Sequence, residues 1–207
     1  PGNTSMKLKR HPMVGRGIHR AIPIAVGDNY KGYRLVGTVN ELFEEHEYAE
    51  GRKFEFVGDG KLFEEDQKQA VAGNFAAEKL GLQVGDTFQP YHGLIYVEES
   101  QHSDVYTVSG ILKSTGTPAD RVIWIPLHGI QNMEGHREET RNDISALLIK
   151  LKSKKAVAIL DPMFNKQGKE YTFASITPVM SRFFQKFGWF EKILELVAYL
   201  VGLVAAG

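Results

Sequence analysis

The C-terminal end of the chain limits its possible folds more than any other segment, because it is a run of uncharged residues that is too short to cross a bilayer. Residues Leu196–Gly207 contain no charged side chain over twelve positions. As a helix this run extends about 18 Å at roughly 1.5 Å per residue, whereas the core of a bilayer needs about 30 Å. The run therefore excludes a complete transmembrane helix and predicts the first part of one. The alternative is an amphipathic helix that docks on the protein's own core.

The segment before this run supports the membrane interpretation. Residues 182–192 mix aromatic rings with positive charges, a composition typical of the boundary between membrane and water. The apolar residues of the run also occupy every face of a helix, whereas a docked surface helix shows a single apolar stripe. We therefore expect a helix over 179–207 that leads towards a membrane.

Composition excludes several classes of protein. Twenty-five Lys and Arg residues balance twenty-five Asp and Glu residues, so no overall positive field attracts nucleic acid. The chain has no cysteine, which excludes disulfides, thiol catalysis and thiolate-bound zinc. Charged residues make up 24% and hydrophobic residues 43% of the chain, which are ordinary values for a folded globular protein.

The pattern of apolar residues predicts an α+β fold. Strands over 18–26 and 33–39 form a hairpin whose turn is Gly27-Asp28-Asn29. Further strands are expected over 69–72, 87–97, 105–112, 122–126, 143–151 and 171–176, and helices over 41–48, 75–80, 153–166 and from Thr177-Pro178 onwards. Pro162 is expected to kink or split the third of these helices. Strict alternation of strands and helices is absent, which favours helices packed on one sheet over a doubly wound sheet.

The sequence shows no standard catalytic motif. It contains no G-x-S-x-G, Walker A, G-x-G-x-x-G or H-E-x-x-H pattern. Paired glutamates such as Glu98 and Glu99 lie in polar segments, which indicates a solvated surface rather than a general acid in an apolar pocket. A small soluble hydrolase stays open as an alternative, because a catalytic triad assembles in space and not in sequence.

Histidines offer the one candidate for a metal site. Without thiolates, such a site must use imidazole and carboxylate ligands, which suit zinc, copper or nickel. His92 and His102 flank a strand end and its polar loop, and a hairpin could fold them towards each other. We predict that His92, His102 and His136 share a divalent transition metal, with water, Glu98, Glu99 or Glu134 completing the shell. The alternative is that these histidines only form hydrogen bonds that order the loop.

Several segments, taken in order, carry a family resemblance. They are AIPIAVGDNYKGYRLVGT, AVAGNFAAEKLGLQVGDTF, VYTVSGILKSTGTPADRVIWIPL and VMSRFFQKFGWFEKILELVAYLVGL. Together they resemble the extracytoplasmic domain of FtsX/MacB/LolC-type ABC transporter permeases, over residues 14–207. The motifs YHG, QH and MEGH further resemble a subgroup of that family that carries histidines at such places.

The resemblance implies a two-lobed domain between the first and second membrane helices of a permease. A membrane-proximal, porter-like βαβ lobe would combine residues 1–66 and 141–178. A smaller mixed α/β outer lobe of the Sabre-like kind would be inserted as residues 67–140. Residues 179–207 would form a stalk helix and the start of a truncated transmembrane helix.

The resemblance also implies a function and a place in the cell. Such a domain is not an enzyme and requires no cofactor. It relays ATP-driven conformational change on the periplasmic side of the bacterial inner membrane. Its partners would be a cytoplasmic ATPase subunit, a second permease copy, and a periplasmic protein or cargo, with no nucleic acid and with membrane contact through the C-terminal helix. A zinc-type metal sensor or delivery module is the main alternative.

Overall fold

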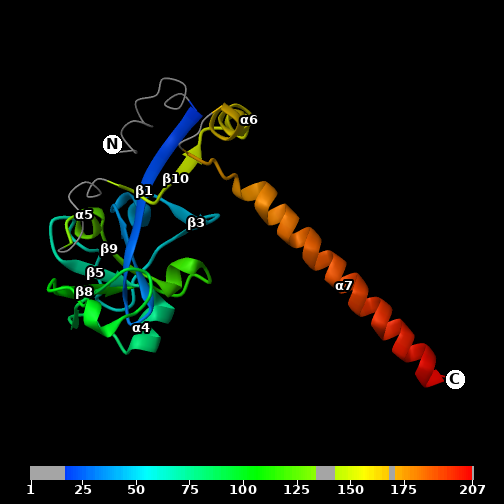
Figure 1. The fold of residues 1–207 in the computed structure, drawn as a ribbon, viewed down its shortest axis with the longest axis horizontal. Coiled ribbons are helices and arrows are strands. Elements are labelled where there is room, and N and C mark those ends of the chain that lie inside the picture. Colours follow the sequence, from blue (N-terminus) through cyan, green and yellow to red (C-terminus); the bar gives the residue numbers. More distant parts are fainter. Residues whose placement is uncertain (1–16, 134–142, 168–170, 207) are drawn as a thin grey trace. The chain divides into compact units, whose positions relative to one another are not determined.

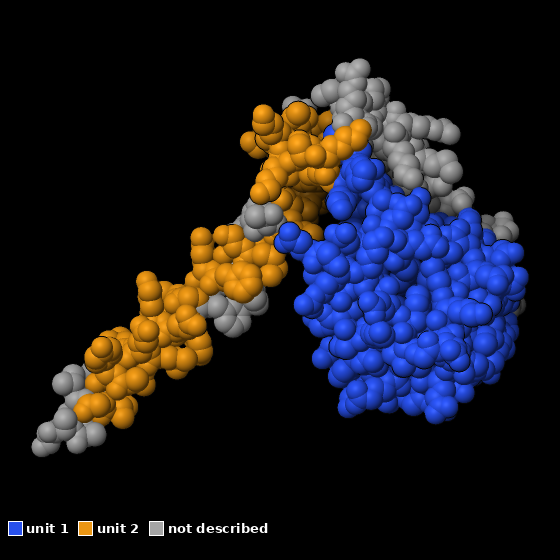
Figure 2. All heavy atoms as spheres, turned by 180° about the vertical axis from the view of Figure 1, so that it is seen from behind, with its two compact units in different colours: residues 1–150 blue, residues 151–207 orange. Residues whose placement is uncertain are grey.

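The computed structural model describes residues 17–133, 143–167 and 171–206 of the 207-residue chain. The chain divides into two compact units, residues 1–150 and 151–207 (Figure 2). Unit 1 holds the sheet and most of the short helices, and unit 2 holds the C-terminal helices (Figure 1).

Unit 1 is built on a mixed sheet with the strand order β10-β1-β2-β9-β5-β8-β6, and β7 pairs with β1 off this path. Strands β2 and β9 run parallel, as do β5 and β8, while β5 and β9 are antiparallel. The bounds are β1 Ile18–Tyr30, β2 Tyr33–Thr38, β5 Gln69–Ala72, β6 Thr87–Phe88, β7 Tyr91–His92, β8 Tyr106–Ile111, β9 Ile123–Pro126 and β10 Ala146–Leu151. The mixed α+β class predicted from the sequence is confirmed.

The predicted hairpin forms, but its turn lies elsewhere. Strand β1 continues through Gly27-Asp28-Asn29 to Tyr30, which pairs with Tyr33. The turn consists of Lys31 and Gly32, both with positive φ (47° and 87°), the conformation that two-residue hairpin turns favour. The register shifts between Val26 and Asp28, so Gly27 is the extra residue of a β-bulge. The prediction of a turn at 27–29 is therefore wrong.

Short helices connect the strands of unit 1. They are α3 Glu41–Glu44, α4 Asn74–Leu80 and α5 Leu127–Gln131, with 3₁₀ turns η1 Glu98–Ser100 and η2 Pro118–Arg121 and a small ladder of β3 Glu47–Ala49 and β4 Arg52–Lys53. Helix α4 ends at Gly81, whose φ of 67° places it in the left-handed region, as the sequence predicts. The predicted helix over 41–48 stops at Glu44, because the chain there turns into β3.

The predicted strand over 87–97 is replaced by two short pieces, β6 and β7. Pro90 lies between them and has no backbone N–H for a ladder bond, which interrupts a continuous strand. Residues 93–97 leave the sheet altogether and form a loop that ends at η1.

Both faces of the sheet are buried, because alternate residues of the central strands belong to different core clusters. Ala70 and Ala72 of β5 pack in one cluster, and Val71 between them packs in the other. Strand β9 shows the same alternation, with Ile123 and Ile125 on one side and Trp124 on the other. The central strands are therefore fixed from both sides.

Unit 2 consists of α6 Lys155–Pro162, a π-helical turn Met163–Gln167 and α7 Ile176–Ala206. Pro162 marks the change from α to π geometry, so the expected interruption is present. The strand predicted over 171–176 is wrong, since residues 171–175 have no regular structure. Instead, the Asn165 side-chain amide donates to the carbonyl of Phe173 (2.7 Å) and accepts from its N–H (2.8 Å).

Helix α7 is continuous over 31 residues and is therefore about 46 Å long. Many of its apolar side chains are exposed, among them Trp189, Leu196 and Tyr199. Within the described part of the chain, no helix has the length and apolar character needed to cross a membrane.

The two lobes expected from the family resemblance share one sheet. Strands β1, β2 and β10 come from the expected inner lobe, and β5, β6, β8 and β9 come from the expected outer lobe. The compact units divide at 150/151, whereas the expected lobe boundaries lie at 66/67 and 140/141. Those lobe boundaries stay a prediction.

Candidate functional site

Three potential metal-ligating side chains meet at one edge of unit 1. They are Asp28 on β1, His92 on β7 and His102 in the segment after η1. One ligand atom from each residue lies within 4.8 Å of the other two. Among the described residues, this is the group of histidine and acidic side chains that lie close enough together to be a candidate metal site.

The β1–β7 ladder places the first two residues. Asp28 and His92 are directly paired across these antiparallel strands, so their side chains lie on the same face of the sheet. The bulge at Gly27 comes immediately before Asp28 and sets which way its carboxylate points. Pairing of two residues 64 positions apart in the sequence therefore places two of the three side chains of the site.

The loop after β7 brings in the third residue. Tyr91 bridges to Gln101, and the N–H of His102 donates to the carbonyl of Pro90 over 2.8 Å. The loop thus returns to its own start, and the rings of His92 and His102 lie 5.4 Å apart at an interplanar angle of 75°. The side-chain amide of Asn29 donates to the carbonyl of Gly93 (2.9 Å), which ties the start of the loop to β1.

The Asp28 carboxylate lies between the two imidazoles. Its Oδ1 is 3.4 Å from Nε2 of His102 and 3.6 Å from Nδ1 of His92. The same oxygen accepts a hydrogen bond from the N–H of Gly93 over 3.0 Å. The side chain of Asp28 is fully buried and that of His102 is 6% exposed, whereas that of His92 is 57% exposed. Two side chains of the group are therefore buried, and the group is open to solvent on the side of His92.

A second carboxylate lies close to this group. Asp104 pairs with the ammonium of Lys68 and is nearly buried. Burial, followed by the negative charges of Asp104 and Asp28, raises the pKa of the Tyr106 hydroxyl well above its usual range. The phenol therefore stays neutral.

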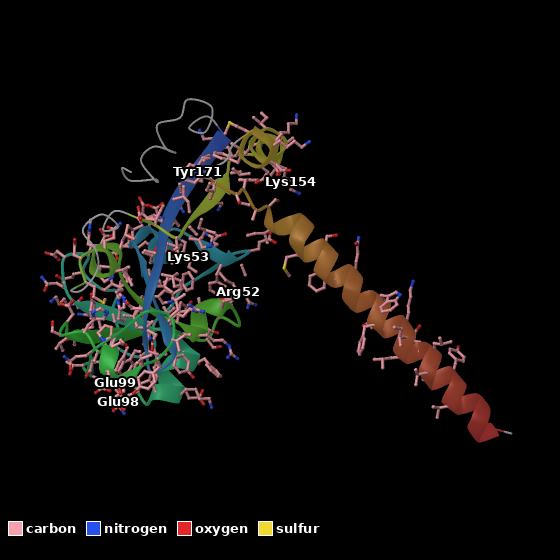
Figure 3. All side chains as sticks on the ribbon, viewed as in Figure 1. Arg52, Lys53, Glu98, Glu99, Lys154 and Tyr171 are labelled. Atoms are coloured by element: carbon pink, nitrogen blue, oxygen red, sulfur yellow. The ribbon has the colours of Figure 1, made fainter. Side chains whose placement is uncertain are left out.

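The structure brings together two of the three predicted ligands, His92 and His102. His136 and Glu134 lie outside the described residues, so their part in the site stays a prediction. Glu98 and Glu99 lie on η1 with exposed side chains, at the periphery of unit 1 in Figure 3, and are not part of the cluster.

Asp28 was missed by sequence reasoning, which assigned it to a turn. The available signal was an acid and an amide, Asp28-Asn29, that follow directly on an alternating apolar strand pattern. That signal identifies a polar position at the end of a strand, but cross-strand pairing with His92 cannot be read from local sequence.

An apolar loop lies between the two histidines. Four consecutive side chains, Leu94 to Val97, are 41–79% exposed, and Ile95 is the most exposed of them. Consecutive exposed apolar residues are unusual on a soluble surface and typically mark a contact with another molecule. Because this loop connects His92 to His102, its exposed apolar side chains lie beside the histidine cluster in the chain.

Comparison with known proteins decides the family. A family model described as the MacB-like periplasmic core domain matches residues 11–161, well over half of the chain. The chain belongs to this family. The resemblance to MacB-type ABC transporter permeases that the sequence predicted is thus confirmed. The matched region ends before the π-helical turn Met163–Gln167 and α7.

A solved structure of a MacB periplasmic region supports the fold. The periplasmic region of MacB from Actinobacillus actinomycetemcomitans gives a TM-score of 0.56 at 13% identity, covering 87% of this chain and 80% of that chain. The extracellular domain of YknZ, a noncanonic ABC-type transporter from Gram-positive bacteria, gives 0.46 at 16% identity, covering 78% and 80%. At such identity the likeness to MacB shows the fold alone. No curated protein matches the chain significantly.

Proposed function

We propose that this chain is the extracytoplasmic domain of an ABC transporter permease subunit and faces the periplasm at a bacterial inner membrane. The observation that supports this most is its membership of the MacB-like periplasmic core family over residues 11–161. Domains of this family belong to transporter permeases, so the proposed role is mechanical transmission rather than catalysis. ATP hydrolysis would be performed by a separate cytoplasmic subunit.

Helix α7 supports the transmission role. It continues without a break for about 46 Å, and in the chain it comes after unit 1, the short helices of unit 2 and the irregular residues 171–175. A continuous helix carries a displacement along its axis, because its backbone hydrogen bonds resist local bending. A movement at the C-terminal end of α7 would therefore reach its N-terminal end at Ile176.

The loop from Leu94 to Val97 is the surface that we propose for contact with a periplasmic partner protein. Its four apolar side chains are exposed without interruption, and two acidic residues, Glu98 and Glu99, follow directly. A central apolar patch with a polar rim is the usual composition of a protein interface.

The transmission proposal is tested in the complete permease with its ATPase. Because the chain has no cysteine, a Trp189→Cys substitution on α7 gives a single labelling site per domain. In a dimer, pulsed electron–electron double resonance between spin labels at this position would report one distance between the two α7 helices. We expect this distance to differ between the nucleotide-free and ATP-trapped states. An unchanged distribution in both states would contradict transmission through α7.

The contact proposal is tested by site-specific photocrosslinking from the same permease in cells. A benzophenone label at Val97→Cys (47% exposed in the native structure) is compared with one at Val84→Cys (49% exposed), a matched apolar position on another loop. We expect a crosslinked periplasmic protein from position 97 and none from position 84. Equal labelling from both positions would show that the loop has no special role.

A further inference from the structure

We infer that Asp28, His92 and His102 form a binding site for one divalent transition metal ion of the zinc type. This inference goes beyond the proposed transport function and does not depend on it. Its basis is that one ligand atom from each of these residues lies within 4.8 Å of the other two. Asp28 Oδ1 in particular lies close to both His92 Nδ1 and His102 Nε2.

The separations between these atoms are compatible with the ligand shell of a single metal ion. Zinc lies about 2.0–2.1 Å from imidazole nitrogen and about 2.0–2.2 Å from carboxylate oxygen, so two ligands of a tetrahedral ion are about 3.4 Å apart. The observed values are 3.4 Å and 3.6 Å from Asp28 Oδ1 to the two imidazole nitrogens. The 3.4 Å contact is also a long hydrogen bond between the His102 ring and the Asp28 carboxylate, which holds these two side chains together without an ion. An ion can therefore fit without a large rearrangement.

The donor set selects the class of metal. Two imidazoles and one carboxylate suit zinc and its neighbours in the first transition row, whereas calcium and magnesium prefer shells made of oxygen. Three protein ligands leave a fourth tetrahedral position, which water can occupy from the open side where His92 is 57% exposed.

The surrounding hydrogen bonds hold the ligands in place before an ion arrives. The N–H of Gly93 donates to Asp28 Oδ1 over 3.0 Å, which orients the carboxylate. The ladder between β1 and β7 fixes Asp28 opposite His92, and the bond from the N–H of His102 to Pro90 closes the loop. Ordered ligands reduce the entropy lost when the metal binds.

The site also has a mechanical consequence for the apolar loop. His92 lies at the start of the segment and His102 at its end, so one ion would bind both ends of the loop to β1. Residues 94–101 would then become a closed, metal-fixed loop. Binding of the ion should therefore slow amide hydrogen exchange in this loop.

The experiment uses the full 207-residue chain without a histidine tag, freed of metal by chelation. Calorimetric titration with zinc chloride should show one ion per chain. His92→Ala is the main variant, because this side chain is largely exposed and its removal leaves the core intact. Asp28→Asn is the second variant, since an amide keeps the shape and the acceptor for Gly93 but ligates zinc poorly. His128→Ala, at an exposed histidine on α5, is the matched control.

We expect each ligand variant to bind zinc at least about tenfold more weakly and the control to bind like the parent. Cobalt in place of zinc should give the intense visible absorption of a tetrahedral site in the parent and lose it in His92→Ala. Zinc should slow exchange over residues 94–101 in the parent only. Absence of one-to-one binding, or equal affinity in parent and His92→Ala, would overturn the site. None of these outcomes depends on nucleotide, so they are separate from the test of transmission.

Discussion

Phe43 on α3 is the residue whose removal should weaken the fold most clearly. Its side chain is almost fully buried and its ring meets three other aromatic rings at an edge-to-face angle. The ring centroids lie 5.3 Å from Phe54, 5.8 Å from Phe63 and 5.7 Å from Trp124, with interplanar angles of 60°, 86° and 87°. Phe43 is therefore the centre of the aromatic cluster on one face of the sheet.

The expected cost follows from that packing. A buried Phe→Ala substitution typically removes about 3–5 kcal/mol from the free energy of unfolding. Edge-to-face pairs contribute about 0.5–1.5 kcal/mol each beyond the buried area, so three of them place Phe43→Ala at about 4–5 kcal/mol. A domain of this size loses about 2–4 °C in Tm per kcal/mol, which predicts a fall of about 8–20 °C.

Urea unfolding followed by tryptophan fluorescence measures this cost. The chain has two tryptophans, so a Trp189→Phe background leaves Trp124, which contacts Phe43, as the sole reporter. Phe43→Leu should lose less than Phe43→Ala, because it keeps most of the apolar volume. Ile95→Ala is the control, since that side chain is 79% exposed and its loss should cost under about 0.5 kcal/mol. A cost below about 2 kcal/mol for Phe43→Ala would refute the packing argument.

Three further predictions concern the helix, pH and metal. Deletion of Leu196–Gly207 should change the unfolding free energy by less than about 1 kcal/mol, because the described side chains of this segment are exposed. The deletion should also reduce self-association in ultracentrifugation. A large loss of stability would instead indicate a docked helix. Burial, followed by the charges of Lys150 and Arg20, lowers the pKa of His46, so the folded state binds a proton less readily than the unfolded state. Stability should therefore fall as the pH drops below about 6.5, and His46→Gln should flatten that fall in thermal melts; an unchanged slope would contradict it. If His136 is a further ligand, as the sequence predicts, His136→Ala should weaken zinc binding at least about tenfold in calorimetry, and unchanged affinity would contradict that role.

Local chemistry made part of the fold predictable. The strand over 69–72 has the bounds expected from its sequence, and the helix predicted over 75–80 ends at Leu80 before Gly81 as expected but begins one residue earlier, at Asn74. A short apolar run and a left-handed glycine both act within a few residues. The α7 helix was predicted from its apolar residues and from Pro178 near its start. Predictions failed where long-range pairing took precedence over local preference, as at Gly27, where a residue expected in a turn became a bulge.

Part of the candidate site could be predicted from the sequence, and part could not. Ligand type and loop length were enough to pair His92 with His102, because the two residues bound one short loop that can close on itself. The carboxylate could not be found by that reasoning, since Asp28 reaches the site only through the ladder between β1 and β7.

By itself, the sequence determined the α+β class, the C-terminal helix and the closeness of His92 and His102, because each depends on composition or on neighbouring residues. The order of its segments was also enough to show the resemblance to the family. Only the tertiary structure decided that β1, β2 and β10 share one sheet with β5, β6, β8 and β9, and that Asp28 completes the histidine pair. The physical reason is that strand pairing joins distant segments through backbone hydrogen bonds that are available to almost any residue. The choice of partner strand is made by burial on both faces of the completed sheet, which no single segment encodes.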